Sequence, residues 1–160
     1  MPVIELKTII RAPIERCFLL SLSVDLHTLS AQDTKEKAIA GITSGTMKMG
    51  DTVTWRAKHF GVYQHLTTKI SAYQMPNYFV SEMVKGAFRK IYHQHIFHPH
   101  ENGTAMTDLF DFEAPFGIFG KIAEKLFLKS YMTKFLAIRN QTIKQTAEGE
   151  EWKKLLNQKP

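Results

Sequence analysis

Apolar and polar positions alternate along most of the first two thirds of the chain. Residues 3–10, "VIELKTII", combine β-branched side chains with partial alternation and predict a strand. From about residue 36 to 113, turn residues separate six more segments of this kind: "EKAIAGI", "DTVTWRAKHF", "VYQHLTTKISAY", "NYFVSEMV", "FRKIYHQHIF" and "AMTDLFDFEAP". Asn102-Gly103 is the clearest hairpin signal, because Asn-Gly adopts positive φ at low cost. The pattern predicts an antiparallel sheet of about seven strands.

The hydrophobic period changes in the last third of the chain. Residues 118–147 are rich in Leu, Ile, Phe, Ala and Lys. Phe119, Ile122 and Leu126 recur at helical spacing, and the pattern continues to Leu136. This indicates one long amphipathic helix, with these apolar residues on the face that packs against the sheet.

Two short helices are predicted directly after the first strand. In "RAPIERCFLLS", Pro13 suits the first helical position, because its missing N–H would have no partner there. "VDLHTL" predicts a second helical turn, with Ser23 as the candidate cap for its free amides. Gly149 is expected to end the long helix, and residues 148–160 to form a short extension or tail.

This order of elements indicates an α+β fold with a single domain over residues 1–147. A sheet whose only substantial helical partner comes last must pack that helix across one face. If the sheet curves around the helix, an apolar cavity can remain between them, and such a cavity is a usual ligand site. We therefore expect a curved antiparallel sheet wrapped around a long C-terminal helix.

Composition and charge narrow the function classes. The single cysteine, Cys17, excludes an intrachain disulfide and suits a reducing compartment, and we expect it to be a buried apolar residue. The net charge of +6 would suit nucleic acid or a membrane surface, but the chain has no compact basic cluster with interleaved aromatic residues. A solvated helix face accounts for the basic residues of the last third: Lys121, Lys125, Lys129, Lys134, Arg139 and Lys144.

The chain lacks the signals of an exported or membrane-spanning protein. No stretch approaches the ~18 consecutive apolar residues of a membrane span. Residues 1–13 lack the basic region and apolar run of a signal peptide. We expect a soluble, cytoplasmic protein with no nucleic-acid partner, for which peripheral membrane contact stays open. The oligomeric state does not follow from the sequence.

Several local sequences, taken in order, resemble the SRPBCC superfamily, the START-like or helix-grip fold shared with the birch-pollen allergen. They are "IIRAPIERCFLLSLSVD", "GDTVTWRAKHFGVYQHLTTKI", "MPNYFVSEMVKGAF", "HQHIFHPHENGTAMTD" and "APFGIFG". The resemblance covers residues 3–147, and the ordered combination is more specific than any one segment. The chain looks most like the small bacterial members described as polyketide cyclase-like or ligand-binding. One departure is "DLHTLSAQ", where members of this type often have a Trp.

The resemblance implies a deep hydrophobic cavity between the sheet and the C-terminal helix. Relatives bind lipids, sterols, quinones, polyketides or plant hormones there. Some members catalyse reactions in the cavity, and many only carry or present a ligand. The resemblance therefore implies ligand binding without a cofactor, and an enzyme of the polyketide cyclase or dehydratase kind is the alternative.

Four of the seven histidines lie within residues 92–100, "YHQHIFHPH". Because side chains alternate across a strand, His93, His95 and Phe97 share one face, and His98 lies on the other. The four histidines are therefore not expected to converge as one group.

The predicted hairpin brings an acidic residue to this strand. A two-residue turn at Asn102-Gly103 places Phe97 opposite Asp108 and His95 opposite Phe110. Asp108 is then diagonal to His95 and within reach of a side-chain pair. The aromatic residues of this face indicate that it looks inward.

His93, His95 and Asp108 leave three functions open. A metal site would need three or four converging ligands, with His59 as a further candidate, but His-x-His on a strand is common without metal, and we expect none. His95 with Asp108 could instead move protons near neutral pH. A buried pair that satisfies itself and orients the polar head of a ligand is the interpretation we prefer over catalysis.

The sequence thus predicts binding, sequestration or transport of a hydrophobic small molecule, such as a lipid, a quinone or a polyketide-like aromatic. The alternative is a cyclase, dehydratase or hydrolase with His95 and Asp108 as the acid–base pair. No cofactor and no metal are expected. The predicted ligand-binding residues, of which the last three belong to a helical lid, are Trp55, His59, His93, His95, Phe97, Asp108, Phe110, Phe112, Phe119, Ile122 and Leu126.

Overall fold

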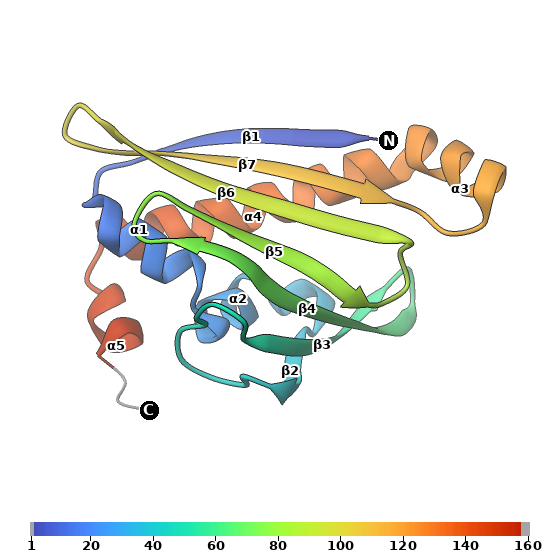
Figure 1. Ribbon diagram of the computed structural model, residues 1–160, viewed down its shortest axis with the longest axis horizontal. Coiled ribbons are helices and arrows are strands. Elements are labelled where there is room, and N and C mark those ends of the chain that lie inside the picture. Colours follow the sequence, from blue (N-terminus) through green and yellow to red (C-terminus); the bar gives the residue numbers. More distant parts are fainter. Residues whose placement is uncertain (1, 158–160) are drawn as a thin grey trace.

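The computed structural model describes residues 2–157 and shows a curved antiparallel sheet of seven strands with a long helix across its concave side (Figure 1). The strand order is β1-β7-β6-β5-β4-β3-β2. The strands are β1 (Val3–Ile10), β2 (Lys37–Gly41), β3 (Thr52–His59), β4 (Val62–Gln74), β5 (Tyr78–Lys85), β6 (Lys90–His100) and β7 (Gly103–Glu113). The predicted helix-grip architecture is confirmed.

The helices also follow the predicted order. They are α1 (Ile14–Ser21), α2 (Val24–Ser30), the 3₁₀ turn Gln32–Thr34, α3 (Gly117–Ala123), the π-helical turn Glu124–Leu128, α4 (Lys129–Glu148) and α5 (Trp152–Leu156). The Ser23 side chain accepts a hydrogen bond from the Leu26 amide and caps α2, as predicted. Beyond Gly149, α5 packs against α1, where the Arg16 guanidinium lies 3.9 Å from the centre of the Trp152 ring.

Two apolar clusters hold the helices to the sheet. In one, the fully buried Phe18 of α1 meets Phe79 and Phe97 edge-on, with 5.5 Å between ring centroids in each pair. Burying a side chain such as Phe18 stabilises the fold by about 1.5–3 kcal/mol. In the other cluster, Phe112 of β7 packs with Leu136 of α4. The clusters fix α1 and α4 against the sheet and leave open space between sheet and helices.

The β6–β7 hairpin turns one residue earlier than predicted. Its turn residues are Glu101 and Asn102, and Gly103 already pairs with His100. A Cβ at Gly103 would lie 2.1 Å from the Ile10 carbonyl oxygen of β1. Glycine is therefore needed here to let β1 approach, and the turn is moved back to Glu101, which adopts a φ of 43°.

This shift changes which residues face each other across the hairpin. His95 lies directly opposite Asp108, Phe97 opposite Met106, and His93 opposite Phe110. The predicted pairs Phe97–Asp108 and His95–Phe110 are wrong by two positions. The prediction that the His93 and His95 face looks inward matches their burial.

The start of the C-terminal helix presents a different face to the sheet from the predicted one. Ile122 is 50% exposed and Leu126 is 73% exposed, so these residues do not pack inward. Gly120 takes the inward position, where a Cβ would lie 2.0 Å from the Pro115 carbonyl oxygen. The π-helical turn that follows holds an extra residue and shifts the phase before α4 begins.

Arg139 was expected on a solvated helix face and is instead 6% exposed, with its guanidinium between α4 and the sheet. It continues the inward row of Met132 and Leu136 at helical spacing, so its position on the helix, not its charge, decides where it points. None of the helices within residues 2–157 is long and apolar enough to cross a membrane.

Candidate functional site

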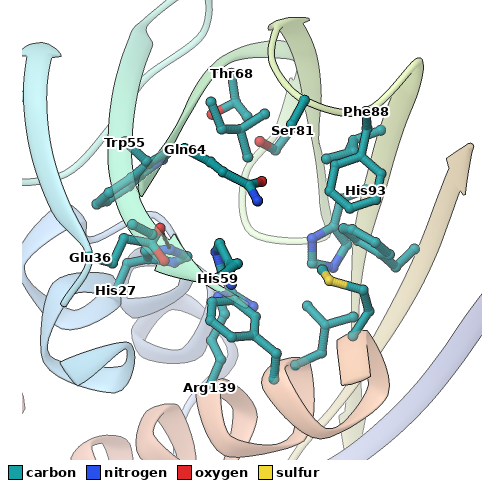
Figure 2. Close-up of a pocket in the computed structure, with 18 of the residues that line it drawn as sticks. His27, Glu36, Trp55, His59, Gln64, Thr68, Ser81, Phe88, His93 and Arg139 are labelled. Atoms are coloured by element: carbon teal, nitrogen blue, oxygen red, sulfur yellow. Dashed lines mark hydrogen bonds and ion pairs between the residues drawn. The ribbon is translucent and has the colours of Figure 1, made fainter. Parts of the chain in front are cut away.

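A cavity of about 860 Å³ lies between the concave face of the sheet and the helices α2, α3 and α4 (Figure 2). Its volume lies within the ~300–1,000 Å³ of small-molecule sites. Inward-facing residues of the strands supply most of its apolar wall, including Trp55, Ile70, Phe79, Ile91 and Phe110. The strand alternation seen in the sequence therefore produces a mostly apolar chamber.

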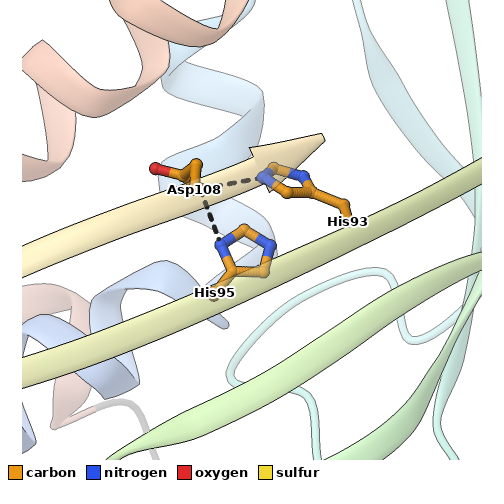
Figure 3. A group of neighbouring side chains, drawn as sticks. All are labelled: His93, His95 and Asp108. Carbon is orange, nitrogen blue, oxygen red and sulfur yellow. Dashed lines mark hydrogen bonds and ion pairs between the residues drawn. The ribbon is translucent and has the colours of Figure 1, made fainter. Parts of the chain in front are cut away.

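A buried polar cluster centred on Asp108 sits at the wall formed by β6, β7 and α4 (Figure 3). Asp108 Oδ1 lies 2.8 Å from His93 Nε2 and 3.0 Å from His95 Nδ1. Its Oδ2 accepts a hydrogen bond of 2.7 Å from Asn140 Nδ2. The Arg139 guanidinium is 3.7 Å from Oδ1 and donates to the Ser21 carbonyl at 3.1 Å. The cluster joins two strands to the long helix.

Asp108 is ionised within this cluster. Burial acts to raise its pKa, but the contacts with His93 and His95 outweigh burial and hold the pKa well below its usual value. Burial lowers the pKa of both histidines, and for His95 the neighbouring His93 lowers it further. The cluster therefore contains one carboxylate, one guanidinium and two neutral imidazoles, and its net charge is zero.

The carboxylate fixes the tautomer of His93. An ionised carboxylate only accepts hydrogen bonds, so His93 must carry its proton on Nε2 and a lone pair on Nδ1. His95 Nδ1 is close to Asp108, but the angle is too poor for a hydrogen bond and the atom has no other partner. In Figure 3 the second nitrogen of each ring lies on the side away from Asp108. Both rings line the cavity, and His93 Nδ1 is a hydrogen-bond acceptor in a mostly apolar wall.

Two further polar pairs line the cavity on the side of α2 and α4. His27 Nε2 of α2 is 2.8 Å from Glu36 Oε1, and the His27 ring lies 4.3 Å from the Trp55 ring. His59 Nδ1 is 2.6 Å from the Tyr131 hydroxyl, and burial lowers the pKa of His59 and raises that of Tyr131. Figure 2 shows His27 and Glu36 on the opposite side of the cavity from His93.

The structure brings about half of the predicted ligand-binding residues to the cavity. The residues that line it are Trp55, His59, His93, His95, Phe110 and Phe119. Asp108 is 1% exposed and acts on the cavity through the two histidines. Phe97 and Phe112 share the inward face but are fully buried in the two apolar clusters, because α1 and α4 cover those ends of the strands. Ile122 and Leu126 lie outside the wall, on the exposed side of the helical segment.

Sequence reasoning missed Arg139, Asn140, His27 and Glu36. The first two could have been found, because residues 132, 136, 139, 140 and 143 form one inward stripe at helical spacing. His27 lies on α2 in "DLHTLSAQ", a segment from which no ligand-binding residue was predicted. Its partner Glu36 precedes β2 and has no local signal, since only the tertiary fold brings the two together.

His93, His95 and Asp108 also form a group with metal-ligand chemistry, with their donor atoms within 4.8 Å of one another. However, both Asp108 oxygens already have partners, and the Arg139 guanidinium supplies the positive charge that the carboxylate needs. A divalent cation bound here would be held close to a buried guanidinium that repels it. The arrangement suits hydrogen bonding to a ligand better than metal coordination.

Solved structures with the same architecture come from bacteria and plants. TTHA0849 from Thermus thermophilus matches with a TM-score of 0.69 and 17% identity over 89% of this chain and 97% of that chain. Major latex-like protein 151 from Panax ginseng matches with a TM-score of 0.67 and 15% identity over 92% and 98%. A START superfamily protein from Mycobacterium smegmatis has a TM-score of 0.67 and 14% identity over 91% and 97%. This chain has the same helix-grip fold as these structures.

At these identities the likeness is one of fold, and the ligand must be inferred from this chain's own cavity. No protein-family model matches the sequence, and no curated protein matches it either. The helix-grip fold accounts for the cavity between sheet and helix. The polar residues that line it are the features from which a ligand class can be argued.

Proposed function

We propose that the protein binds, sequesters or transports a hydrophobic small molecule, such as a lipid, a quinone in its reduced hydroxyl form or a polyketide-like aromatic, and orients a hydroxyl group of it on His93 and His95. The observation that carries this proposal is the 860 Å³ apolar cavity with two neutral imidazoles set into its wall. Burial of apolar ligand surface supplies affinity, at ~25 cal/mol per Å² removed from water. Trp55, Phe79 and Phe110 supply wall for that surface.

The lone pairs of the imidazoles set the preference for a hydroxyl group. Neutral His93 holds its proton toward Asp108, so the cavity side of the ring accepts a hydrogen bond. A phenol or alcohol can donate one, whereas a methyl ether cannot. Leaving a buried acceptor without a partner costs about 1–3 kcal/mol, which corresponds to roughly tenfold or more in affinity.

A titration with two aromatic probes tests this proposal. Binding of 2-naphthol and 2-methoxynaphthalene is measured by fluorescence on the wild type, and the hydroxyl probe is expected to bind roughly tenfold more tightly. His93→Leu is expected to remove this preference, and His98→Leu, on the exposed face of the same strand, to keep it. Equal affinity of the two probes for the wild type would refute the assigned role of His93.

A second pair of variants tests the cavity itself. Ala57 is buried on β3 and lines the cavity, so Ala57→Trp places an indole in the ligand's space and is expected to weaken both probes. Ala137→Trp adds the same side chain on the exposed side of α4 and is the matched control. If both variants bind the probes like the wild type, the probes do not occupy this cavity.

Acid–base catalysis is the second candidate, and the contact of the neutral imidazoles with one carboxylate favours it. Burial lowers the pKa of His95 well below its ordinary value, which makes it a weak base and favours binding over catalysis. A cyclase or dehydratase substrate turned over with a bell-shaped pH–rate profile that His95→Ala abolishes would reverse this preference.

A further inference from the structure

Large apolar side chains are exposed around the mouth of the cavity. Phe116 is 83% exposed, Phe119 75% and Ile118 70%, whereas Phe18, Phe79 and Phe97 are fully buried. We call this the mouth surface, and its residues are Phe60, Phe116, Ile118, Phe119, Leu126 and Phe127. A contiguous exposed apolar patch marks a site of interaction.

The mouth surface joins two parts of the chain that are distant in sequence. The Phe60 ring, in the β3–β4 turn, lies 5.8 Å from the Phe127 ring and 4.7 Å from the Tyr131 ring. Figure 1 shows α3 at one end of the molecule, where this helix extends past the end of β7. Phe60, Phe116 and Phe127 also line the cavity, so the exposed apolar surface is continuous with the cavity wall.

The backbone holds two of these aromatic residues in a costly conformation. Phe60 has a φ of 52° and Phe116 a φ of 72°, in the left-handed region that favours glycine. At Phe60 the two-residue β3–β4 turn, in which His59 pairs with Val62, requires this conformation. Phe116 is 83% exposed, so packing of its side chain within residues 2–157 does not compensate for its conformation.

The exposed charged side chains on the helical part of the mouth surface have one sign. Lys121, Lys125 and Lys129 are exposed on the same helical segment. The only acidic residue between residues 116 and 134 is Glu124, which is buried and accepts a hydrogen bond from the Ala114 amide. Exposed apolar side chains flanked by lysines without an exposed acid complement an anionic lipid surface.

We propose that the mouth surface docks on an anionic membrane. A second copy of the chain would bring the same lysines together across the contact, and their repulsion disfavours that occupant. A docked protein would open its cavity toward the lipid, so that an apolar ligand passes between bilayer and cavity without crossing water. The docking follows from the exposed side chains, and only its part in ligand exchange rests on the proposed function.

Vesicle co-sedimentation of the full chain tests the docking. The protein is expected to sediment with vesicles of phosphatidylcholine mixed with phosphatidylglycerol, to bind pure phosphatidylcholine weakly, and to dissociate as salt rises. Lys121→Gln with Lys125→Gln is expected to lower the partition coefficient by roughly 30-fold, from about 1 kcal/mol for each lysine. Lys37→Gln with Lys48→Gln makes the same change of charge at exposed positions on and near β2, away from the mouth, and is expected to have little effect.

Apolar insertion is tested separately from charge. Ile118→Asp with Leu126→Asp replaces two residues that lie outside the cavity wall and is expected to abolish vesicle binding. Leu29→Asp, at an exposed position on α2, is the control and is expected to bind like the wild type.

The outcomes separate the docking from the proposed function. Vesicle binding without any probe binding would refute the proposed ligand and leave the docking standing. Probe binding by a wild type that does not sediment with anionic vesicles would refute the docking alone. A dimer in solution that Ile118→Asp with Leu126→Asp dissociates would also overturn it, because a second copy would then cover the mouth surface.

Discussion

Replacing Arg139 with methionine removes the cation that balances the buried Asp108 carboxylate. Arg139 Nη1 lies 3.7 Å from Asp108 Oδ1, and at an effective dielectric constant of about 20 this separation corresponds to about 4.5 kcal/mol of attraction. The variant leaves an uncompensated charge at a carboxylate that is 1% exposed. We expect Arg139→Met to lower the free energy of unfolding by about 3–5 kcal/mol, the cost of breaking a buried pair.

The loss of stability in Arg139→Met should depend on pH, because His93 can take up a proton. In the wild type, burial holds the folded-state pKa of His93 below that of the unfolded chain, so stability falls as pH drops through the ordinary histidine pKa of ~6.5. Without Arg139, the lone carboxylate favours a protonated His93 and raises its folded-state pKa. The stability that the variant gains from a protonated His93 beside Asp108 is present at acidic pH and is lost as pH rises. The difference between variant and wild type should therefore shrink as the solution is acidified.

Urea unfolding followed by tryptophan fluorescence, above and below the ordinary histidine pKa, measures both effects. Asp108→Asn with Arg139→Met removes both charges and should cost less than the sum of the single changes. Arg89→Met is the control, because Arg89 forms an exposed pair with Glu113 at 3.3 Å and should cost at most about 1 kcal/mol. An Arg139→Met cost as small as that of Arg89→Met, the same at both pH values, would refute the neutral buried cluster.

Three other changes test particular contacts. Gly120→Ala places a Cβ 2.0 Å from the Pro115 carbonyl oxygen and should lower the free energy of unfolding by about 1–3 kcal/mol; an unchanged urea midpoint would contradict this packing. Tyr131→Phe removes the hydroxyl 2.6 Å from His59 Nδ1 and should lower the free energy of unfolding by about 0.5–1.5 kcal/mol in the same assay. A gain in stability would contradict this hydrogen bond. Cys17 is fully buried and burial raises its pKa, so a thiol reagent should label it only in urea, and fast labelling of the native protein would disprove its burial.

The element order could be read from the sequence because it depends on local periodicity. Alternation over residues 52–59 and 103–113 and the helical repeat after residue 117 each require one kind of secondary structure. Ser23 caps α2 through a contact three residues away, which is equally local. Features of this kind do not depend on the rest of the fold.

The hairpin register and the helix phase depended on distant neighbours. Asn102-Gly103 is a good turn sequence, but the approach of Ile10 on β1 requires the glycine inside the strand. Leu126 has the spacing of an inward residue, but Gly120 and Glu124 hold the inward positions of this segment, so Leu126 is exposed. In both cases a close backbone contact at a glycine overrode a valid pattern.

The polar site was only partly predictable. His95 and Asp108 could be brought together by counting residues within one hairpin, although the count was off by two. Arg139 was assigned to solvent because its charge was weighted above its position on the helix. His27 and Glu36 meet only in the folded chain, so no spacing rule would have paired them.

Native mass spectrometry of the freshly purified protein, compared with its denatured mass, tests the proposed ligand binding most directly. We expect an adduct of several hundred daltons that is lost on denaturation and is absent or reduced in Ala57→Trp, in which an indole occupies the cavity. Ala137→Trp should keep the adduct. Only the bare chain mass in the wild type, together with no binding of 2-naphthol, would contradict a ligand-binding cavity.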